Sequence, residues 1–211
     1  MAEAADGMKK LMGESGIASN SETAVRLQTY LALLEKWNSR INLTSTTEWN
    51  SVGPLFQEGI WAARMYPEDT AAHLDIGSGA GFPAMVIRIL KPNMQLDLVE
   101  SRSKKGIFLE TLSSALQLGC IRVHAMRLQA FLQQAERNKA WDCISWKGLK
   151  LSGDDLKLLL EHAHAATQFW MFHGSELAVE EPEILLKYLR LSRTERFSGR
   201  NRWALSIYMP K

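Results

Sequence analysis

Apolar residues recur at intervals of three and four positions over the first part of the chain. One stripe consists of Leu27, Tyr30, Leu31, Leu34, Trp37 and Ile41. This spacing predicts an amphipathic helix over about residues 21–40, and Ser19 and Glu22 have the Ser-x-x-Glu form of a capping box at its start. A second helical pattern ends before Pro67. We therefore expect a helical extension over 21–70, after a flexible, irregular segment over 1–20.

The pattern changes after residue 70, where short apolar runs alternate with helical periodicity. Strands are predicted at 73–76, 96–100, 121–125, 143–145 and 169–172, and helices at 83–90, 107–118, 127–137 and 153–166. Such alternation is typical of a parallel sheet with helices on both faces. The tail ends in an apolar run, 203–208, that predicts a strand pair closing the sheet. The fold class is therefore α/β, with residues 71–211 as its main domain.

Composition excludes several other classes of protein. The 211 residues are 46% hydrophobic and 23% charged, which are ordinary globular proportions. No apolar run is long enough for a membrane span, and two cysteines cannot form a disulfide scaffold. We expect Cys120 and Cys143 to be buried, reduced thiols. Because no export signal is evident at the N-terminus, the expected compartment is the cytoplasm.

A glycine-rich segment follows the first predicted strand, at the corner where doubly wound sheets bind nucleotides. Dinucleotide folds need a glycine at the sixth motif position, where this chain has Phe82. Gly-x-Gly-x-Gly preceded by an acidic residue instead favours S-adenosylmethionine (SAM). Glu100 ends the second strand, where it can accept hydrogen bonds from ribose hydroxyls. The residues predicted from the loop to bind the cofactor are Asp75, Gly77, Ser78, Gly79 and Gly81.

Three segments carry a more specific pattern. They are Lys-Trp-Asn through Asn-Leu-Thr over 36–45, Leu-Asp-Ile-Gly-Ser-Gly-Ala-Gly-Phe-Pro over 74–83, and Leu-Val-Glu-Ser over 98–101 with two lysines following. Together they resemble the RsmG (GidB) family of 16S rRNA guanine-N7 methyltransferases, and the resemblance covers about residues 25–209. It implies a class I SAM-dependent methyltransferase, Rossmann-like, with a mostly parallel seven-stranded sheet and an N-terminal helical extension. It also implies methylation of guanine N7 in a 16S rRNA loop near the decoding region.

The resemblance also assigns roles to individual positions. Carried over by position, Gly77, Gly79 and Phe82 would surround the methionine part of the cofactor. Glu100 and Ser101 would hold its ribose. The adenine would meet Leu128 and Gln129, and the remaining implied cofactor contacts are Ser145 and Trp146.

Four positions depart from the family pattern. The family's His-x-x-Asp-Ser is replaced by residues 55–59, Leu-Phe-Gln-Glu-Gly, and a family carboxylate is replaced by Gln129. Trp146 stands where an arginine is expected, with Lys147 one residue later, and His173 replaces a lysine. Two alternatives therefore stay open: a catalytically silent RNA-binding relative, or a SAM-dependent enzyme with a different RNA or small-molecule substrate.

Methylation of guanine N7 needs no proton abstraction, because N7 carries a free lone pair. We therefore expect alignment and exclusion of water rather than acid–base catalysis. The candidates for positioning the base are Asn42, Thr44, Glu58 and His173. His162 and His164 fall on a predicted helix with their rings ~200° apart, so no metal site is expected.

The net charge of +2 hides an uneven distribution. The tail from 187 to 211 holds seven basic residues and one acidic residue, with Phe197, Trp203 and Tyr208 among them. Arginine binds phosphates and aromatic rings stack on bases, which predicts RNA binding. The proposed RNA contacts are Arg102, Lys104, Lys105, Arg127, Arg200 and Arg202. The expected partner is 16S rRNA or a precursor of the small ribosomal subunit, bound by a monomer without membrane or metal.

Overall fold

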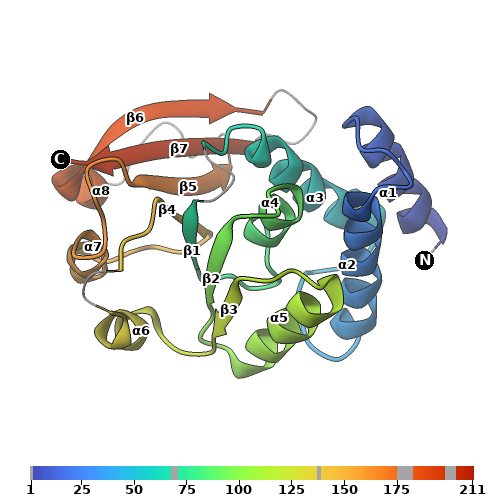
Figure 1. Cartoon of the computed structure of the whole chain (residues 1–211), viewed down its shortest axis with the longest axis horizontal. Coiled ribbons are helices and arrows are strands. Elements are labelled where there is room, and N and C mark those ends of the chain that lie inside the picture. Colours follow the sequence, from blue (N-terminus) through green and yellow to red (C-terminus); the bar gives the residue numbers. More distant parts are fainter. Residues whose placement is uncertain (1, 68–70, 137–138, 175–182, 198–202) are drawn as a thin grey trace.

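A seven-stranded sheet runs through the computed structural model, which describes residues 2–67, 71–136, 139–174, 183–197 and 203–211 (Figure 1). Its strands are β1 (Ala72–Ile76), β2 (Gln95–Val99), β3 (Ile121–His124), β4 (Cys143–Lys147), β5 (Gln168–Gly174), β6 (Leu189–Arg196) and β7 (Trp203–Pro210). The order is β3-β2-β1-β4-β5-β7-β6. Strands β1 to β5 pair in parallel, and β7 is antiparallel to both β5 and β6. The predicted α/β class, the mostly parallel sheet and the closing strand pair are confirmed.

Helices cover both faces of this sheet (Figure 1). They are α1 (Ala2–Glu14), α2 (Glu22–Asn38), α3 (Trp49–Ala63), α4 (Ala84–Leu90), α5 (Ser103–Leu116), α6 (Leu128–Gln134), α7 (Gly153–Leu160) and α8 (Glu183–Tyr188). Helices α1 to α5 pack together on one side, and α6, α7 and α8 pack in sequence on the other. The strand order reverses between β1 and β4, so ligands are expected beyond the carboxyl ends of these strands.

The N-terminus differs from the irregular segment expected over 1–20. Residues 2–14 form α1, whose apolar side chains Ala4, Met8, Leu11 and Met12 are buried. Their spacing places them on one helix face, although the small and polar residues between them hide the pattern. Helix α2 buries the first four residues of the predicted stripe, but Trp37 is half-buried and Ile41 lies beyond the end of the helix at Asn38. Its N-cap is Ser21 rather than Ser19: the Ser21 hydroxyl accepts a hydrogen bond from the Ala24 amide, 3.1 Å away.

Helices α5, α6 and α7 end earlier than expected, α6 at Gln134. Helix α5 stops at Leu116 because Gln117 adopts a left-handed conformation, and Cys120 beyond it is exposed rather than buried. Helix α7 stops at Leu160, so His162 and His164 lie outside it. These histidines bond separately to Lys139 O and to the Asp142 carboxylate.

The described residues contain neither a candidate membrane span nor a candidate metal cluster. None of their helices is long and apolar enough to cross a membrane. No group of three or more metal-ligating side chains forms among them.

Asp97 forms a buried polar cluster at the middle of β2. Its carboxylate accepts hydrogen bonds from Arg122 and His124 of β3, and from Lys139 and Trp141 before β4. Burial alone would raise the pKa of Asp97. The hydrogen bonds from His124, Lys139 and Trp141 outweigh burial and hold this pKa well below its usual value. The cluster therefore ties β3 and the segment before β4 to β2.

Candidate functional site

The glycine-rich segment between β1 and α4 depends on left-handed backbone conformations. Gly77, Gly79 and Gly81 have φ angles of +68°, +59° and +94°, a region that other residues enter with strain. At Gly81 space is limiting as well, because a Cβ atom would lie 2.8 Å from both the Tyr30 hydroxyl and Met85 Cγ. At Gly77 and Gly79 the nearest atoms to such a Cβ are 3.5 and 3.7 Å away, which leaves these two positions open on one side.

Helices α2 and α3 of the helical extension pack against this loop. The Tyr30 hydroxyl donates a hydrogen bond of 2.6 Å to Ala80 O. Phe82 stacks on the Tyr30 ring with centroids 4.9 Å apart and meets Phe56 edge-on at 5.0 Å. The Phe82 ring is thus buried in the layer formed by α2 and α3. Its predicted contact with the cofactor would have to come from its backbone.

Glu100 joins the end of β2 to the glycine loop. One carboxylate oxygen accepts a hydrogen bond from the Gly79 amide and the other from the Arg102 amide, each 2.8 Å long. A carboxylate oxygen has a second lone pair, so Glu100 retains the capacity to accept from two ribose hydroxyls. Ser101, beside it, is exposed.

Asp75, one residue before the end of β1, belongs to a buried hydrogen-bonded chain that the sequence did not reveal. Ser145 of β4 lies opposite Asp75 in the sheet and donates to its carboxylate at 2.5 Å. The Ser145 oxygen also bonds to His73 Nε2 at 2.8 Å. Burial raises the pKa of Asp75 to about 7 and lowers that of His73 to about 3. Ser145 therefore contacts Asp75 within the sheet, beneath the glycine loop. His73 joins the predicted residues Asp75 and Ser145 through its bond to the Ser145 hydroxyl.

The predicted adenine contacts follow β3, the neighbour of β2. Leu128 and Gln129 open helix α6, and Arg127 precedes them as its N-cap residue. The Gln129 amide donates to the Asp155 carboxylate of α7 at 3.2 Å. This region and Glu100 lie at the same edge of the sheet, because β2 and β3 are parallel neighbours.

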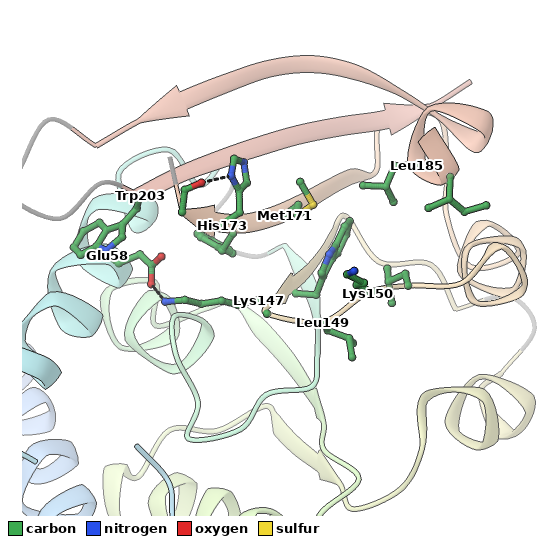
Figure 2. A pocket seen from close by; sticks show the side chains of 14 residues that line it. Glu58, Lys147, Leu149, Lys150, Met171, His173, Leu185 and Trp203 are labelled. Atoms are coloured by element: carbon green, nitrogen blue, oxygen red, sulfur yellow. Dashed lines mark hydrogen bonds and ion pairs between the residues drawn. The ribbon is translucent and has the colours of Figure 1, made fainter. Parts of the chain in front are cut away.

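A cavity of about 720 Å³ opens beyond the ends of β4 and β5 (Figure 2). Three residues singled out from the sequence, Glu58, Trp146 and His173, line it together. Leu149, also in its lining, lies 3.5 Å from the position of a Cβ on Gly77. The cavity therefore adjoins the glycine loop. The other lining residues are Lys147, Gly148, Lys150, Leu151, Met171, Phe172, Gly174, Ile184, Leu185 and Trp203.

An ion pair closes one side of this cavity. Lys147, at the end of β4, donates to the carboxylate of Glu58 in α3. Glu58 is 1% exposed, and burial raises its pKa while the Lys147 charge opposes the rise. His173 lies across the cavity, where its ring bonds to Ser206 Oγ and Gly174 O, both at 2.9 Å. The sequence did not indicate the pair, because its members are 89 positions apart.

The remaining positioning candidates, Asn42 and Thr44, lie in the loop between α2 and α3. Asn38 holds this loop by accepting hydrogen bonds from the Leu43 and Thr44 amides, both at 2.9 Å. Thr44 donates to Thr46 O at 2.8 Å, and Asn42 is exposed. Within the described chain neither residue belongs to the cavity lining.

The predicted RNA contacts are distributed over the surface near the loop. Arg102, Lys104 and Arg127 are exposed, and Lys105 is half-buried. Arg200 and Arg202 lie outside the described residues.

The aromatic residues of the tail divide into two groups. Trp203 lines the cavity and stacks on Phe197 with ring centroids 4.5 Å apart. Tyr208 is fully buried, which excludes the predicted stacking on bases. The physical reason is that the Tyr208 side chain packs in a core cluster with Leu156 and Leu159 of α7 and Leu185 of α8, which cover this face of the sheet.

Comparison with known proteins identifies the family. The family model GidB, described as rRNA small subunit methyltransferase G, matches residues 23–193. The chain belongs to this family. A GidB relative, ribosomal RNA small subunit methyltransferase G of Bacillus velezensis, is 34% identical over 136 residues, which are 64% of this chain and 57% of that protein. The protein of the same name in Roseiflexus is 29% identical over 188 residues, which are 88% of this chain and 77% of that protein. The match thus spans little more than half the length of the Bacillus relative.

Solved structures show the fold of this GidB member independently. A putative O-methyltransferase from Klebsiella pneumoniae matches with a TM-score of 0.61 at 12% identity, covering 86% of this chain and 90% of that one. A SAM-dependent methyltransferase from Aquifex aeolicus matches with a TM-score of 0.56 at 15% identity, covering 74% and 91%. The predicted class I methyltransferase fold is confirmed.

Proposed function

We propose that this chain is a SAM-dependent methyltransferase that methylates guanine N7 in a loop of 16S rRNA. The observation that carries the proposal is the placement of the glycine loop and Glu100 beside the cavity beyond β4 and β5, in a member of the GidB family. An enzyme of this kind needs a cofactor site and a base site side by side. Leu149, between Gly77 and the cavity, marks where the two adjoin.

The residues present fit SAM. The open sides of Gly77 and Gly79 let a ligand approach the backbone closely, and Glu100 retains lone pairs for two ribose hydroxyls. Leu128 and Gln129 would meet the adenine from the start of α6. Bound SAM supplies an electrophilic methyl group.

The chain's own contribution to the reaction is positioning. Guanine N7 attacks with its free lone pair, so no residue has to remove a proton. Apolar cavity residues such as Leu149, Met171 and Trp203 would exclude water around the base. The Glu58 carboxylate lies at this cavity, where it would stabilise the positive charge that the base acquires.

RNA would approach from the surface that carries the exposed basic residues. Arg102 and Lys104 follow Glu100 directly, and Arg127 precedes the proposed adenine contacts. Phosphates bound there would place a nucleotide near the cavity mouth. We propose that the chain acts as a monomer on 16S rRNA or on a precursor of the small subunit.

Deletion of the gene tests the proposal in the host. We expect one 7-methylguanosine of 16S rRNA to disappear and to return when the chain is supplied again. Gly79→Arg should not restore it, because a long side chain would occupy the open cofactor side of the loop. An unchanged modification pattern in the deletion strain would reject the substrate.

Calorimetric titration with SAM distinguishes an enzyme from a silent RNA-binding relative. Folded wild-type chain should bind SAM, and Gly79→Arg should not. Failure of the folded wild-type chain to bind would favour the silent relative.

A further inference from the structure

We propose that Glu58 and Lys147 recognise the target guanine by its Watson–Crick edge, with Glu58 accepting from N1–H and the 2-amino group and Lys147 donating to O6. This inference rests on the proposed methylation of guanine and names the residues that select the base. Glu58 belongs to α3 and Lys147 to β4, and both line the cavity beside the glycine loop.

The first supporting observation is an acceptor without a donor. Lys147 engages Oε2 of Glu58, whereas Oε1 is buried and has no hydrogen-bond partner among the described residues. Leaving a carboxylate oxygen unpaired away from water is unfavourable. A ligand that brings N–H donors into the cavity would pair it.

The second observation is the order of charges along the cavity wall. Figure 2 shows Glu58 beside Trp203, with the Lys147 side chain extending to the Glu58 carboxylate. Along its Watson–Crick edge, guanine presents the acceptor O6 next to the donors N1–H and N2–H. The ammonium group of Lys147 complements the acceptor, and the neighbouring carboxylate of Glu58 complements the donors. Adenine presents an amino donor and an N1 lone pair instead, so both contacts would be repulsive. The pair therefore selects guanine over adenine.

The third observation is that the cavity offers a surface for the base plane. Trp203 lines it and is held in place by Phe197 stacked at 4.5 Å. Enzymes that modify a base commonly bind it unstacked, between aromatic or apolar side chains, and read its Watson–Crick edge. A cavity of about 720 Å³ is within the usual range for a small-molecule site.

The contact would strengthen during the reaction. The N7 lone pair forms the new bond to the methyl carbon, the carbon–sulfur bond breaks, and its electron pair stays on sulfur. The sulfonium charge is lost, and one positive charge appears on the guanine ring, with no proton transferred. N1–H and N2–H become more acidic as the ring gains charge, so their hydrogen bonds to Glu58 are stronger in the transition state than in the bound substrate.

The test compares two target nucleotides in wild type and variants. Small-subunit rRNA is assembled by splint ligation with guanosine or inosine at the nucleotide that wild type methylates, since inosine lacks the 2-amino group. We expect wild type to lose about 10- to 100-fold in kcat/KM on inosine. Glu58→Gln should lower kcat on guanosine by a similar factor and lose most of the discrimination, because the effects of contacting groups are not additive. SAM affinity should stay within about twofold of wild type if the cofactor site is intact.

Two further variants complete the test. Glu58→Asp keeps the charge and should recover part of the rate and of the discrimination against inosine. A purely structural ion pair predicts recovery of the rate but not of the discrimination. Glu195→Gln is the matched control, because Glu195 pairs with Arg193 on β6 and is absent from the described cavity lining; it should behave as wild type. Should Glu58→Gln not fold, the wild-type inosine measurement and Glu58→Asp still decide.

Two kinds of result would contradict two different claims. If Glu58→Gln discriminates against inosine as strongly as wild type, or if wild type does not discriminate at all, the assignment of Glu58 is wrong while guanine methylation stands. If wild type methylates no guanosine RNA despite binding SAM, the proposed function fails and the base assignment fails with it.

Discussion

At the scale of single residues, Gly81 combines two requirements at one position. Its φ of +94° is unfavourable for a side chain, and a Cβ would lie 2.8 Å from the Tyr30 hydroxyl. We expect Gly81→Ala to lower the free energy of unfolding by about 2–4 kcal/mol. Gly13→Ala in α1 is the control, because nothing among the described residues lies within 4 Å of its Cβ position. Urea denaturation measures both, and equal stabilities would contradict the packing of the loop.

Also at this scale, Asp75 and His73 make stability depend on pH in opposite directions. Asp75 ionises with a raised pKa, so its contribution to stability is present in acid and is lost as pH rises from 3.8 to about 7. His73 has a lowered pKa, so its contribution is lost as pH falls from 6.5 to about 3. Between pH 3.8 and about 7, the ionisation of Asp75 lowers the free energy of unfolding by an amount on the order of 4 kcal/mol.

Asp75→Asn separates the two groups, since only the Asp75 contribution disappears. Relative to wild type, the variant should gain stability progressively as pH rises from 3.8 to about 7, as followed by urea denaturation at each pH. His73→Gln, which removes the other ionisable group, should shift the comparison in the opposite direction. A stability difference between Asp75→Asn and wild type that is constant with pH would show that Asp75 ionises normally.

At the scale of elements, helix α2 acts on the cofactor loop from outside the sheet. The Tyr30 hydroxyl holds Ala80 O at 2.6 Å, so Tyr30→Phe should leave the fold intact and weaken SAM binding by about 5- to 10-fold. Tyr66→Phe is a matched control, because the Tyr66 ring stacks on His73 rather than on the loop. Calorimetry gives both affinities; equal losses in the two variants would indicate a general effect of removing a buried hydroxyl.

The elements differ in how well the sequence predicts them. Buried parallel strands such as β1 and β2 are predicted because apolar runs of their length alternate with helices and turns. Helix α1 is not predicted, because its apolar residues, among them Met8 and Met12, are too few to give a clear helical pattern. The packing of α1 against α2 and α3, which buries them, is not visible in the sequence. The end of α7 is missed since no glycine or proline marks Leu160 as its last residue.

In the site, too, the sequence predicts residues that lie in local motifs but not contacts between distant segments. Gly77, Gly79 and Glu100 are local to strand ends and follow a short motif, so the sequence predicts them. Glu58 and Lys147 meet only because α3 packs near the end of β4, and local patterns carry no information on that contact. The neighbours of Tyr208 in sequence suggest RNA binding, whereas the packing of α7 and α8 on β7 buries its ring.

At the scale of the whole molecule, charge near the cofactor loop should guide RNA. Arg102 and Lys104 are exposed just after Glu100. Changing both to Gln should weaken rRNA binding and reduce the slope of log affinity against log salt by roughly 2. Changing Lys9 and Lys10 of α1 to Gln removes the same charge elsewhere and should alter the slope less. An equal slope in wild type and the Arg102/Lys104 variant would exclude this surface from the RNA site.

The most direct measurement of the central claim is methyl transfer by the purified chain. Small subunits and naked 16S rRNA from a strain lacking the gene are incubated with labelled SAM, and the modified nucleotide is identified by mass spectrometry. We predict one methyl group per RNA, on guanine N7, and none with Gly79→Arg. Transfer to another atom or nucleotide, or no transfer to either substrate by chain that binds SAM, would contradict the claim.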